Sequence, residues 1–285
     1  MTRWTRQNLR HVLQMLRFGD RPAATVYDSL GADPWAAADR GWLNLGLWSG
    51  AGDDAEAPAA VRRLVATLAA ALPPGGVVLD VGCGLGVQDA VIAEIARPRR
   101  LVALNITASQ LVAGRANLAT AEARPVCADA CRLPVGSNTV DGLISVEAAF
   151  HFSSRADFFA EAARVLRPGG VLAMSDVSVE RAPRTAAEVL AGVCNIRFWG
   201  IRRGALASAA DIAVLARHAG FDSVEIGKTG QRVIVPGVRF LRRRLDGVRR
   251  APPGQRLVAR LLMSQWALLY SRGVIDYLFV RATAT

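Results

Sequence analysis

The chain has 285 residues, of which 52% are hydrophobic, 6% aromatic and 21% charged, and its formal net charge is +11. This composition excludes an intrinsically disordered chain, and four cysteines are too few for a disulfide scaffold of this length. The longest nearly uncharged stretch, residues 64–79, contains the helix-breaking run Pro73-Pro74-Gly75-Gly76, so no transmembrane helix is expected and the protein is predicted to be cytoplasmic.

The N-terminal residues combine apolar side chains at helical spacing with arginines. Residues 2–18 show this pattern most clearly and predict a basic amphipathic helix, which would pack on its own domain or lie on an acidic membrane surface. An aromatic segment, residues 41–48, and an acidic stretch, residues 49–56, follow it. We interpret residues 1–57 as an N-terminal helical or lid segment.

From residue 58 onward, helix-like and strand-like segments alternate at the lengths that a parallel α/β sheet requires. Strands are expected at 77–81, 101–105, 124–128, 141–146, 171–176, 222–228 and 275–282. Helices are expected at 59–72, 87–96, 107–121, 155–166 and 208–219. The pattern predicts an α/β domain over 58–285 with a mostly parallel seven-stranded sheet and helices on both faces.

Two further segments interrupt this alternation and are interpreted as an inserted helical cap, at about 180–207 and 236–271. The second is strongly basic, since eight arginines between residues 239 and 260 face one acid, Asp246. Such a cluster attracts acidic membrane surfaces, anionic substrates or nucleic acid.

A glycine loop, Gly82-Cys83-Gly84-Leu85-Gly86, follows the first predicted strand and allows the backbone to approach a bound nucleoside closely. Val87 occupies the position where a dinucleotide fingerprint has glycine or alanine, which argues against a nicotinamide cofactor. Asp80, two residues before the loop, suits a ligand that carries an ammonium and a sulfonium group.

Polar residues also follow the next two strands. Asn105 ends the second strand, where α/β nucleoside sites place a partner for a ribose hydroxyl, and Asp129 follows the third. The carboxyl ends of neighbouring strands meet at one edge of a sheet, so these side chains are expected to lie together.

Several motifs resemble class I S-adenosylmethionine-dependent methyltransferases, in particular small-molecule O-methyltransferases of the erythromycin 3''-O-methyltransferase type, over roughly residues 40–235. They are residues 44–48, 84–89, 146–151, 157–159 and 166–170. The resemblance implies a Rossmann-like fold, S-adenosylmethionine as the cofactor, and an aromatic segment over that cofactor. The predicted cofactor-binding residues are Asp80, Gly82, Cys83, Gly84, Gly86, Gln88, Asn105, Ile106, Asp129, Ala130, Glu147 and Trp48.

A general base is predicted from two strand ends. His151 follows the fourth strand and Asp176 ends the fifth, so an imidazole oriented by a carboxylate could take the proton of an attacking hydroxyl, as the resemblance to sugar O-methyltransferases also implies. A structural histidine is the alternative. Acceptor contacts are predicted for Phe150, Trp199 and Phe240. No metal site is expected, because no second ligand pair accompanies the cysteines at 127 and 131.

Together these observations predict methyl transfer to a hydroxyl of a natural product, glycoside or lipid-like acceptor. C- or N-methylation of a quinone, lipid or amine is the alternative. A nucleic-acid methyltransferase is disfavoured because Glu147-Ala148-Ala149-Phe150 stands where base N-methyltransferases carry an Asn/Asp-Pro-Pro-aromatic motif, and no nucleic-acid partner is expected. A non-catalytic cofactor-binding protein and peripheral contact with an acidic membrane stay open.

Overall fold

The computed structural model describes residues 41–247 and 253–285. The predicted amphipathic helix at 2–18 and part of the basic cluster, Arg249 and Arg250, lie outside these residues. The division of the chain at residue 57 therefore stays a prediction.

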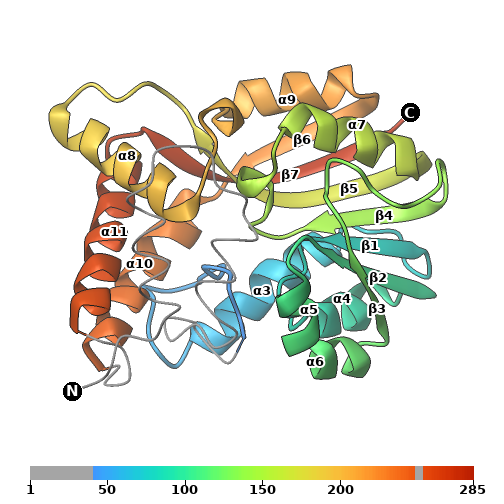
Figure 1. Cartoon of the computed structure of the whole chain (residues 1–285), viewed down its shortest axis with the longest axis horizontal. Coiled ribbons are helices and arrows are strands. Elements are labelled where there is room, and N and C mark those ends of the chain that lie inside the picture. Colours follow the sequence, from blue (N-terminus) through green and yellow to red (C-terminus); the bar gives the residue numbers. More distant parts are fainter. Residues whose placement is uncertain (1–40, 248–252) are drawn as a thin grey trace.

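A seven-stranded sheet in the order β3-β2-β1-β4-β5-β7-β6 runs through the molecule (Figure 1). Its strands are β1 Val77–Val81, β2 Arg100–Asn105, β3 Ala123–Cys127, β4 Val140–Ser145, β5 Leu166–Val179, β6 Phe221–Lys228 and β7 Ile275–Ala284. The first five are parallel, and β7 is inserted antiparallel between β5 and β6. The predicted fold class is confirmed. The strand order reverses at β1, which lies between β2 and β4, and this is where open α/β sheets bind ligands.

Helices cover both faces of the sheet (Figure 1). They are α3 Ala57–Ala69, α4 Asp89–Ala96, α5 Ala108–Ala113, α6 Arg115–Thr120, α7 Arg155–Val165 and α9 Ala209–His218. One hydrophobic core lies under α3 and α4, and a second lies under α7 and α9. The single helix predicted over 107–121 is divided at Gly114, where a Cβ atom would lie 2.3 Å from the carbonyl oxygen of Leu85. This division lets the glycine loop pack directly on the backbone.

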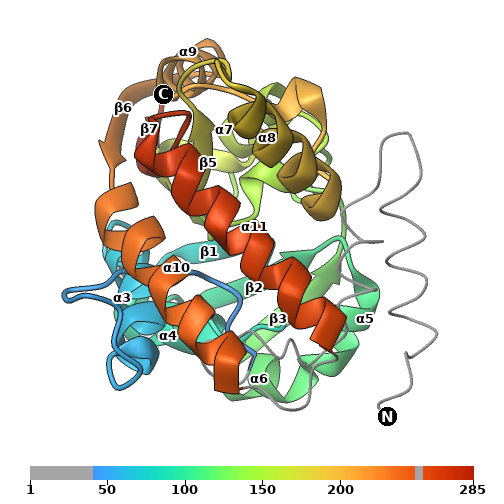
Figure 2. The same cartoon turned by 90° about the vertical axis from the view of Figure 1, so that its left-hand side faces the viewer.

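Three longer helices stand together at one end of the sheet (Figures 1 and 2). They are α8 Ala186–Trp199, α10 Gly230–Gly247 and α11 Pro253–Ser271. The second cap element begins at Gly230, before its predicted start at 236, and Pro236 lies within α10. The two predicted cap segments thus form one cluster, in which α11 packs on both α8 and α10.

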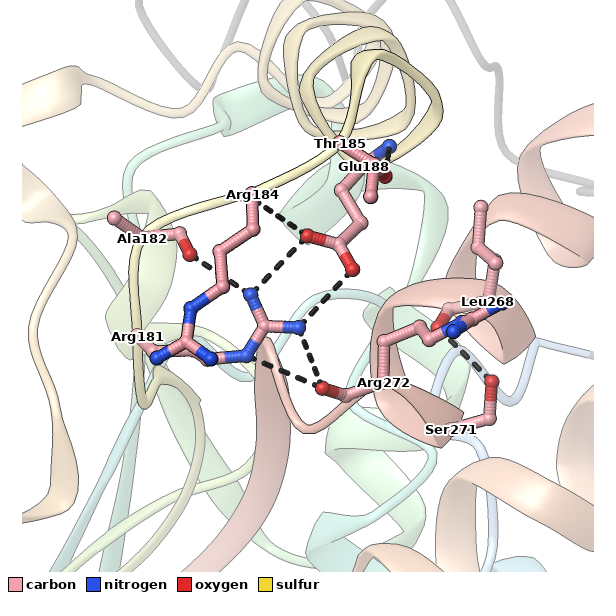
Figure 3. Close-up of polar contacts among 8 residues, drawn as sticks. All are labelled: Arg181, Ala182, Arg184, Thr185, Glu188, Leu268, Ser271 and Arg272. Carbon is pink, nitrogen blue, oxygen red and sulfur yellow. Dashed lines mark hydrogen bonds and ion pairs between the residues drawn. The ribbon is translucent and has the colours of Figure 1, made fainter.

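An arginine bridge ties α8 to the end of α11 (Figure 3). The guanidinium of Arg181 donates to both carboxylate oxygens of Glu188, at 3.1 and 3.0 Å, and to the carbonyl of Arg272 at 2.7 Å. Further along the two helices, the Asn195 amide donates to Gln265 at 3.0 Å. The cap is therefore fastened at two points along the pair.

Part of the basic cluster serves internal contacts. Arg239 donates to the carbonyl of Ala51 at 3.1 Å, and Arg243 contacts the carbonyl of Gly52 and the carboxylate of Asp54. These arginines connect α10 to the acidic stretch that precedes α3. Part of the positive charge of the basic cluster therefore interacts with groups of the protein itself.

Candidate functional site

A cavity of about 350 Å³ opens at the carboxyl ends of β1, β2 and β4. Its wall is built by the glycine loop, by the residues that follow β2, β3 and β4, and by the cap. Twelve of the residues predicted from the sequence line this cavity: Gly82, Cys83, Gly84, Gln88, Asn105, Ile106, Asp129, Ala130, Glu147, Phe150, His151 and Trp199. Segments that are far apart in the sequence thus meet at the predicted edge of the sheet.

The three glycines of the loop have positive φ angles, but they serve different contacts. At Gly82, φ is +88° and a Cβ atom would lie 2.4 Å from the Cβ of Ala148, so only glycine lets β1 and the segment after β4 approach here. Gly86, at φ +70°, packs on Leu118 of α6 and does not line the cavity. Its predicted cofactor contact is replaced by a packing role.

Asp80 lies beneath the loop and not in the cavity wall. Its side chain is fully buried, and both carboxylate oxygens accept from the Gln88 amide, at 3.0 and 2.7 Å. Burial raises the pKa of Asp80 to about 7, although the Gln88 hydrogen bonds lower it. Gln88 itself lines the cavity, so Asp80 is joined to the cavity wall through Gln88, and its predicted cofactor contact stays a prediction.

Polar groups follow β2 and β3 as predicted, and the structure adds two that the sequence reasoning missed. The Asn105 amide donates to Gln110 at 2.8 Å, and both residues line the cavity. Thr107, in the same wall, has a buried hydroxyl with no hydrogen-bond partner among the described residues. Asp129 accepts from the backbone N–H of Cys131 at 2.9 Å, which fixes its carboxylate. The Asn105 side-chain oxygen, which accepts no hydrogen bond from the described residues, and this Thr107 hydroxyl are left to bind a ligand.

Glu147 occupies a strained position directly after β4. Its φ is +51°, and its backbone N–H donates to the Ser175 hydroxyl at 3.0 Å. One carboxylate oxygen, Oε1, accepts from the backbone N–H of Leu45 at 2.9 Å and from the Tyr277 hydroxyl at 2.8 Å. Burial raises the pKa of this carboxyl to about 7, against the lowering effect of both donors.

The predicted pairing of His151 with Asp176 is wrong. Asp176 is fully buried and accepts two hydrogen bonds from Arg155, at 2.8 and 3.0 Å. This arginine begins α7 and reaches the end of β5, so it takes the carboxylate that was assigned to the imidazole. The structure therefore places Asp176 in a buried ion pair outside the cavity wall.

His151 lies in the cavity wall, where Asp176 does not. Its ring lies 4.3 Å from the ring of Phe150 and 6.5 Å from that of Trp199, between centroids. Burial lowers the pKa of His151 to about 3, a hydrogen bond with the backbone of Trp199 opposes this, and the charge of Arg155 adds to the lowering. The imidazole is therefore neutral, and a weak base, near neutral pH.

Two predicted aromatic contacts are also corrected. Trp48 and Phe240 are each 1% exposed and pack together, with ring centroids 5.3 Å apart. They form a small core against α3 and are absent from the cavity wall, because the Trp48 indole donates to the Leu45 carbonyl at 2.8 Å and so faces inward. Trp42, Met263 and Trp266 line the cavity instead. The spacing of apolar residues in the sequence does not show whether an aromatic side chain lies in the core or in the cavity wall.

No metal centre is formed by the described part of the chain, within which no group of three or more His, Cys, Asp or Glu side chains converges. In the wall of the cavity, burial and the nearby carboxylates of Asp80 and Asp89 raise the pKa of the Cys83 thiol. This cysteine is therefore not a thiolate nucleophile.

Comparisons with known proteins agree with this architecture. Residues 79–174 match the family model described as a methyltransferase domain. The chain is 31% identical to the erythromycin 3''-O-methyltransferase of Saccharopolyspora erythraea, over 90% of this chain and 84% of that protein. It is also 31% identical to 24-methylenesterol C-methyltransferase 3 of Arabidopsis thaliana, over 53% of this chain and 43% of that protein.

Among solved structures, the geranyl diphosphate C-methyltransferase of Streptomyces coelicolor, in complex with Mg²⁺, geranyl diphosphate and S-adenosylhomocysteine, shares the fold. The TM-score is 0.69 at 15% identity, and the match covers 93% of this chain and 99% of that one. The shared fold thus covers most of the chain.

Proposed function

Because the chain belongs to the S-adenosylmethionine-dependent methyltransferase family, we propose that it transfers the cofactor's methyl group to a hydroxyl of a natural product, glycoside or lipid-like small molecule. The observation that carries this proposal is the 31% identity to an O-methyltransferase across 90% of the chain.

The cavity fits the cofactor. Gly82 and Gly84 of the loop bring the backbone into the cavity wall without a Cβ atom, and the hydroxyl of Thr107 is buried without a partner among the described residues. Asn105 and Asp129 would hold the nucleoside end, and Glu147 places a carboxylate in the same wall, which suits a cationic ligand. When bound, S-adenosylmethionine supplies an electrophilic methyl group on a sulfonium. The chain's own residues orient the acceptor and exclude water.

The other part of the wall favours an apolar acceptor. Leu43, Phe150, Trp199, Met263 and Trp266 all line the cavity. Aromatic and thioether side chains contact ring systems and aliphatic surfaces well. We therefore expect the hydroxyl to belong to a largely apolar molecule.

Transfer to carbon is the second candidate, and the sterol C-methyltransferase relative is the observation that favours it. The new bond distinguishes the two reactions, because an O-methyl and a C-methyl carbon have well-separated NMR shifts. Hydroxylated macrolides, sterols and phenols offered with ¹³C-methyl-labelled S-adenosylmethionine should yield an O-methyl signal.

Cofactor choice is tested by calorimetry. S-adenosylmethionine and S-adenosylhomocysteine are expected to bind with measurable heat, and NAD is not. Val87, directly after the glycine loop, lines the cavity and stands where a dinucleotide fingerprint has glycine or alanine. Heat with NAD and none with the adenosyl ligands would refute the proposal.

Replacing His151 with alanine is expected to lower turnover by about a hundredfold, the cost of a misplaced acceptor, while S-adenosylhomocysteine affinity stays unchanged. The ring lies between Phe150 and Trp199 in the cavity wall, so its loss disturbs the acceptor side. Turnover measured at saturating cofactor, beside calorimetry of the same variant, tests this. Wild-type turnover would show that His151 is structural.

Contact with an acidic membrane surface stays a prediction. Within residues 41–247 and 253–285, no helix is long and apolar enough to cross a membrane. Exposed apolar side chains on α8 and α11, such as Leu190 and Leu257 at 62% and 59% exposure, support the prediction. The proposed acceptor is a small molecule, and no nucleic-acid partner is proposed.

A further inference from the structure

Glu147 is a carboxylate held in the cavity wall by one of its two oxygens. Both described donors, the Leu45 N–H and the Tyr277 hydroxyl, bind Oε1. None of the described residues donates a hydrogen bond to Oε2. This oxygen is also not one of the fully buried side-chain atoms that lack a partner, so it is accessible from the cavity that Glu147 lines. One oxygen fixes the side chain, and the other can accept a hydrogen bond from a ligand in the cavity that Glu147 lines.

We infer that Glu147 accepts the proton of the acceptor hydroxyl during methyl transfer. This inference rests on the function proposed above. In the step, the hydroxyl oxygen forms a bond to the methyl carbon as the methyl–sulfur bond breaks, and the electron pair of that bond stays on sulfur. The hydroxyl proton moves to Oε2 of Glu147, which becomes a neutral carboxylic acid and loses the proton to solvent when product leaves.

Other titratable groups in the described wall are less suited to this task. Arg202 carries positive charge and cannot accept a proton, and the Cys83 thiol is kept protonated by burial. Asp129 follows β3, which β2 and β1 separate from β4, and one of its oxygens is held by the Cys131 N–H. His151 is a weak base, with its pKa lowered to about 3. Only Glu147, with its pKa raised to about 7, is matched to neutral pH.

The local backbone supports a functional role. Glu147 has a φ of +51°, which is uncommon for a residue with a Cβ atom. Such conformations cost free energy and persist where the surroundings impose them. Here the Ser175 hydroxyl holds the backbone N–H, and the neighbouring Ala148 packs on Gly82 of the cofactor loop. The carboxylate is thus positioned relative to the cofactor by both β1 and β5.

The charged and titratable groups around Glu147 come from several elements. Tyr277 of β7 donates to it, and burial raises the pKa of this tyrosine so that it stays a neutral donor. Asp176 of β5 is neutralised by Arg155 of α7. His151 follows on the same segment, and Asp80 lies beneath the loop with its own raised pKa. Asp80 is therefore the group whose titration must be separated from that of Glu147.

A first test uses only the cofactor and its product. A sulfonium beside Glu147 favours the carboxylate, so binding of S-adenosylmethionine at pH 7 should release about half a proton more than binding of S-adenosylhomocysteine, because a group with pKa near 7 is half protonated there. Calorimetry in two buffers of different ionisation enthalpy measures this difference. It should vanish in Glu147→Gln, which keeps the shape and the Oε1 hydrogen bonds, and persist in Asp80→Asn.

Three results would overturn the inference. The difference in proton release could persist in Glu147→Gln, or it could vanish only in Asp80→Asn. Alternatively, Glu147→Gln could weaken S-adenosylhomocysteine binding more than tenfold, which would mean that Glu147 binds the cofactor. Absence of heat with either adenosyl ligand in the wild type refutes the proposed function itself and is distinguishable from these.

A second test follows turnover against pH with an acceptor from the labelled-methyl experiment. The kcat/KM for S-adenosylmethionine, which reports groups of the free enzyme, should fall in the wild type as pH drops through about 7. The turnover of Glu147→Gln should be lower by at least about a hundredfold. Tyr277→Phe removes a donor that stabilises the carboxylate, so the midpoint should move to higher pH. A profile flat from pH 5.5 to 9, or an unshifted midpoint in Tyr277→Phe, would contradict a proton acceptor at Glu147.

Discussion

Replacing Arg155 with methionine is expected to lower the free energy of unfolding by roughly 3–5 kcal/mol. Arg155 is 4% exposed and Asp176 is fully buried, and their two hydrogen bonds, at 2.8 and 3.0 Å, satisfy both carboxylate oxygens. Removing the guanidinium leaves Asp176 in the interior with no opposite charge. Urea unfolding followed by circular dichroism measures the loss.

A matched control separates the unpaired charge from the loss of packing. The double variant Arg155→Met with Asp176→Leu removes both charges and fills similar volume, so its stability should lie close to that of the wild type or above it. If the single and double variants are equally unstable, the loss comes from packing and not from the buried carboxylate. A single variant as stable as the wild type would contradict the ion pair itself.

This ion pair also explains how the acceptor side of the cavity is held. Arg155 begins α7, a few residues after the short helix Ala149–His151, and Asp176 lies in β5 beside β4. The pair therefore fixes the segment that carries Glu147 and His151 against the sheet. We expect the variant to show a raised KM for the acceptor as well as lower stability.

The sheet could be predicted from the sequence because buried parallel strands are continuous apolar runs, as in Val77–Val81, and because a glycine loop marks the end of the first. Most of the cavity residues could then be predicted because they follow the carboxyl ends of neighbouring strands. Elements after Asp176 could be predicted less well, since the cap has no repeating strand pattern. Its helices are positioned by contacts such as that between Arg181 and Glu188.

The details of the site could not be predicted because they depend on partners far away in the chain. Glu147 is held by Leu45 and Tyr277, which are 102 and 130 residues distant. Asp176 was assigned to His151 by strand adjacency, but adjacency does not show that Arg155 competes for the same carboxylate. The positions of the strand ends predict which residues lie near the cavity. The charges of all neighbouring side chains decide which of these residues form hydrogen bonds or ion pairs with one another.

Replacing Gly82 with alanine is expected to weaken binding of S-adenosylhomocysteine by about tenfold to a hundredfold, the equivalent of the 1–3 kcal/mol that backbone strain at such a site costs. The added Cβ atom would lie 2.4 Å from the Cβ of Ala148. The segment after β4 and the glycine loop must then separate, and both contribute to the cavity wall. Calorimetry gives the affinity, and the thermal shift produced by the ligand gives an independent measure.

Gly75→Ala is the matched control for this variant. Gly75 also has a left-handed φ, +71°, but nothing lies within 4 Å of the position its Cβ atom would take. Both variants carry the cost of a non-glycine residue at positive φ, roughly 1 kcal/mol or more, and only Gly82→Ala adds a collision. A loss of affinity confined to Gly82→Ala, with Gly75→Ala losing only stability, would locate the effect at the contact with Ala148. Wild-type affinity in Gly82→Ala would mean that the loop can move away from β4 without disturbing the ligand, and the close approach would then not be part of the cofactor site.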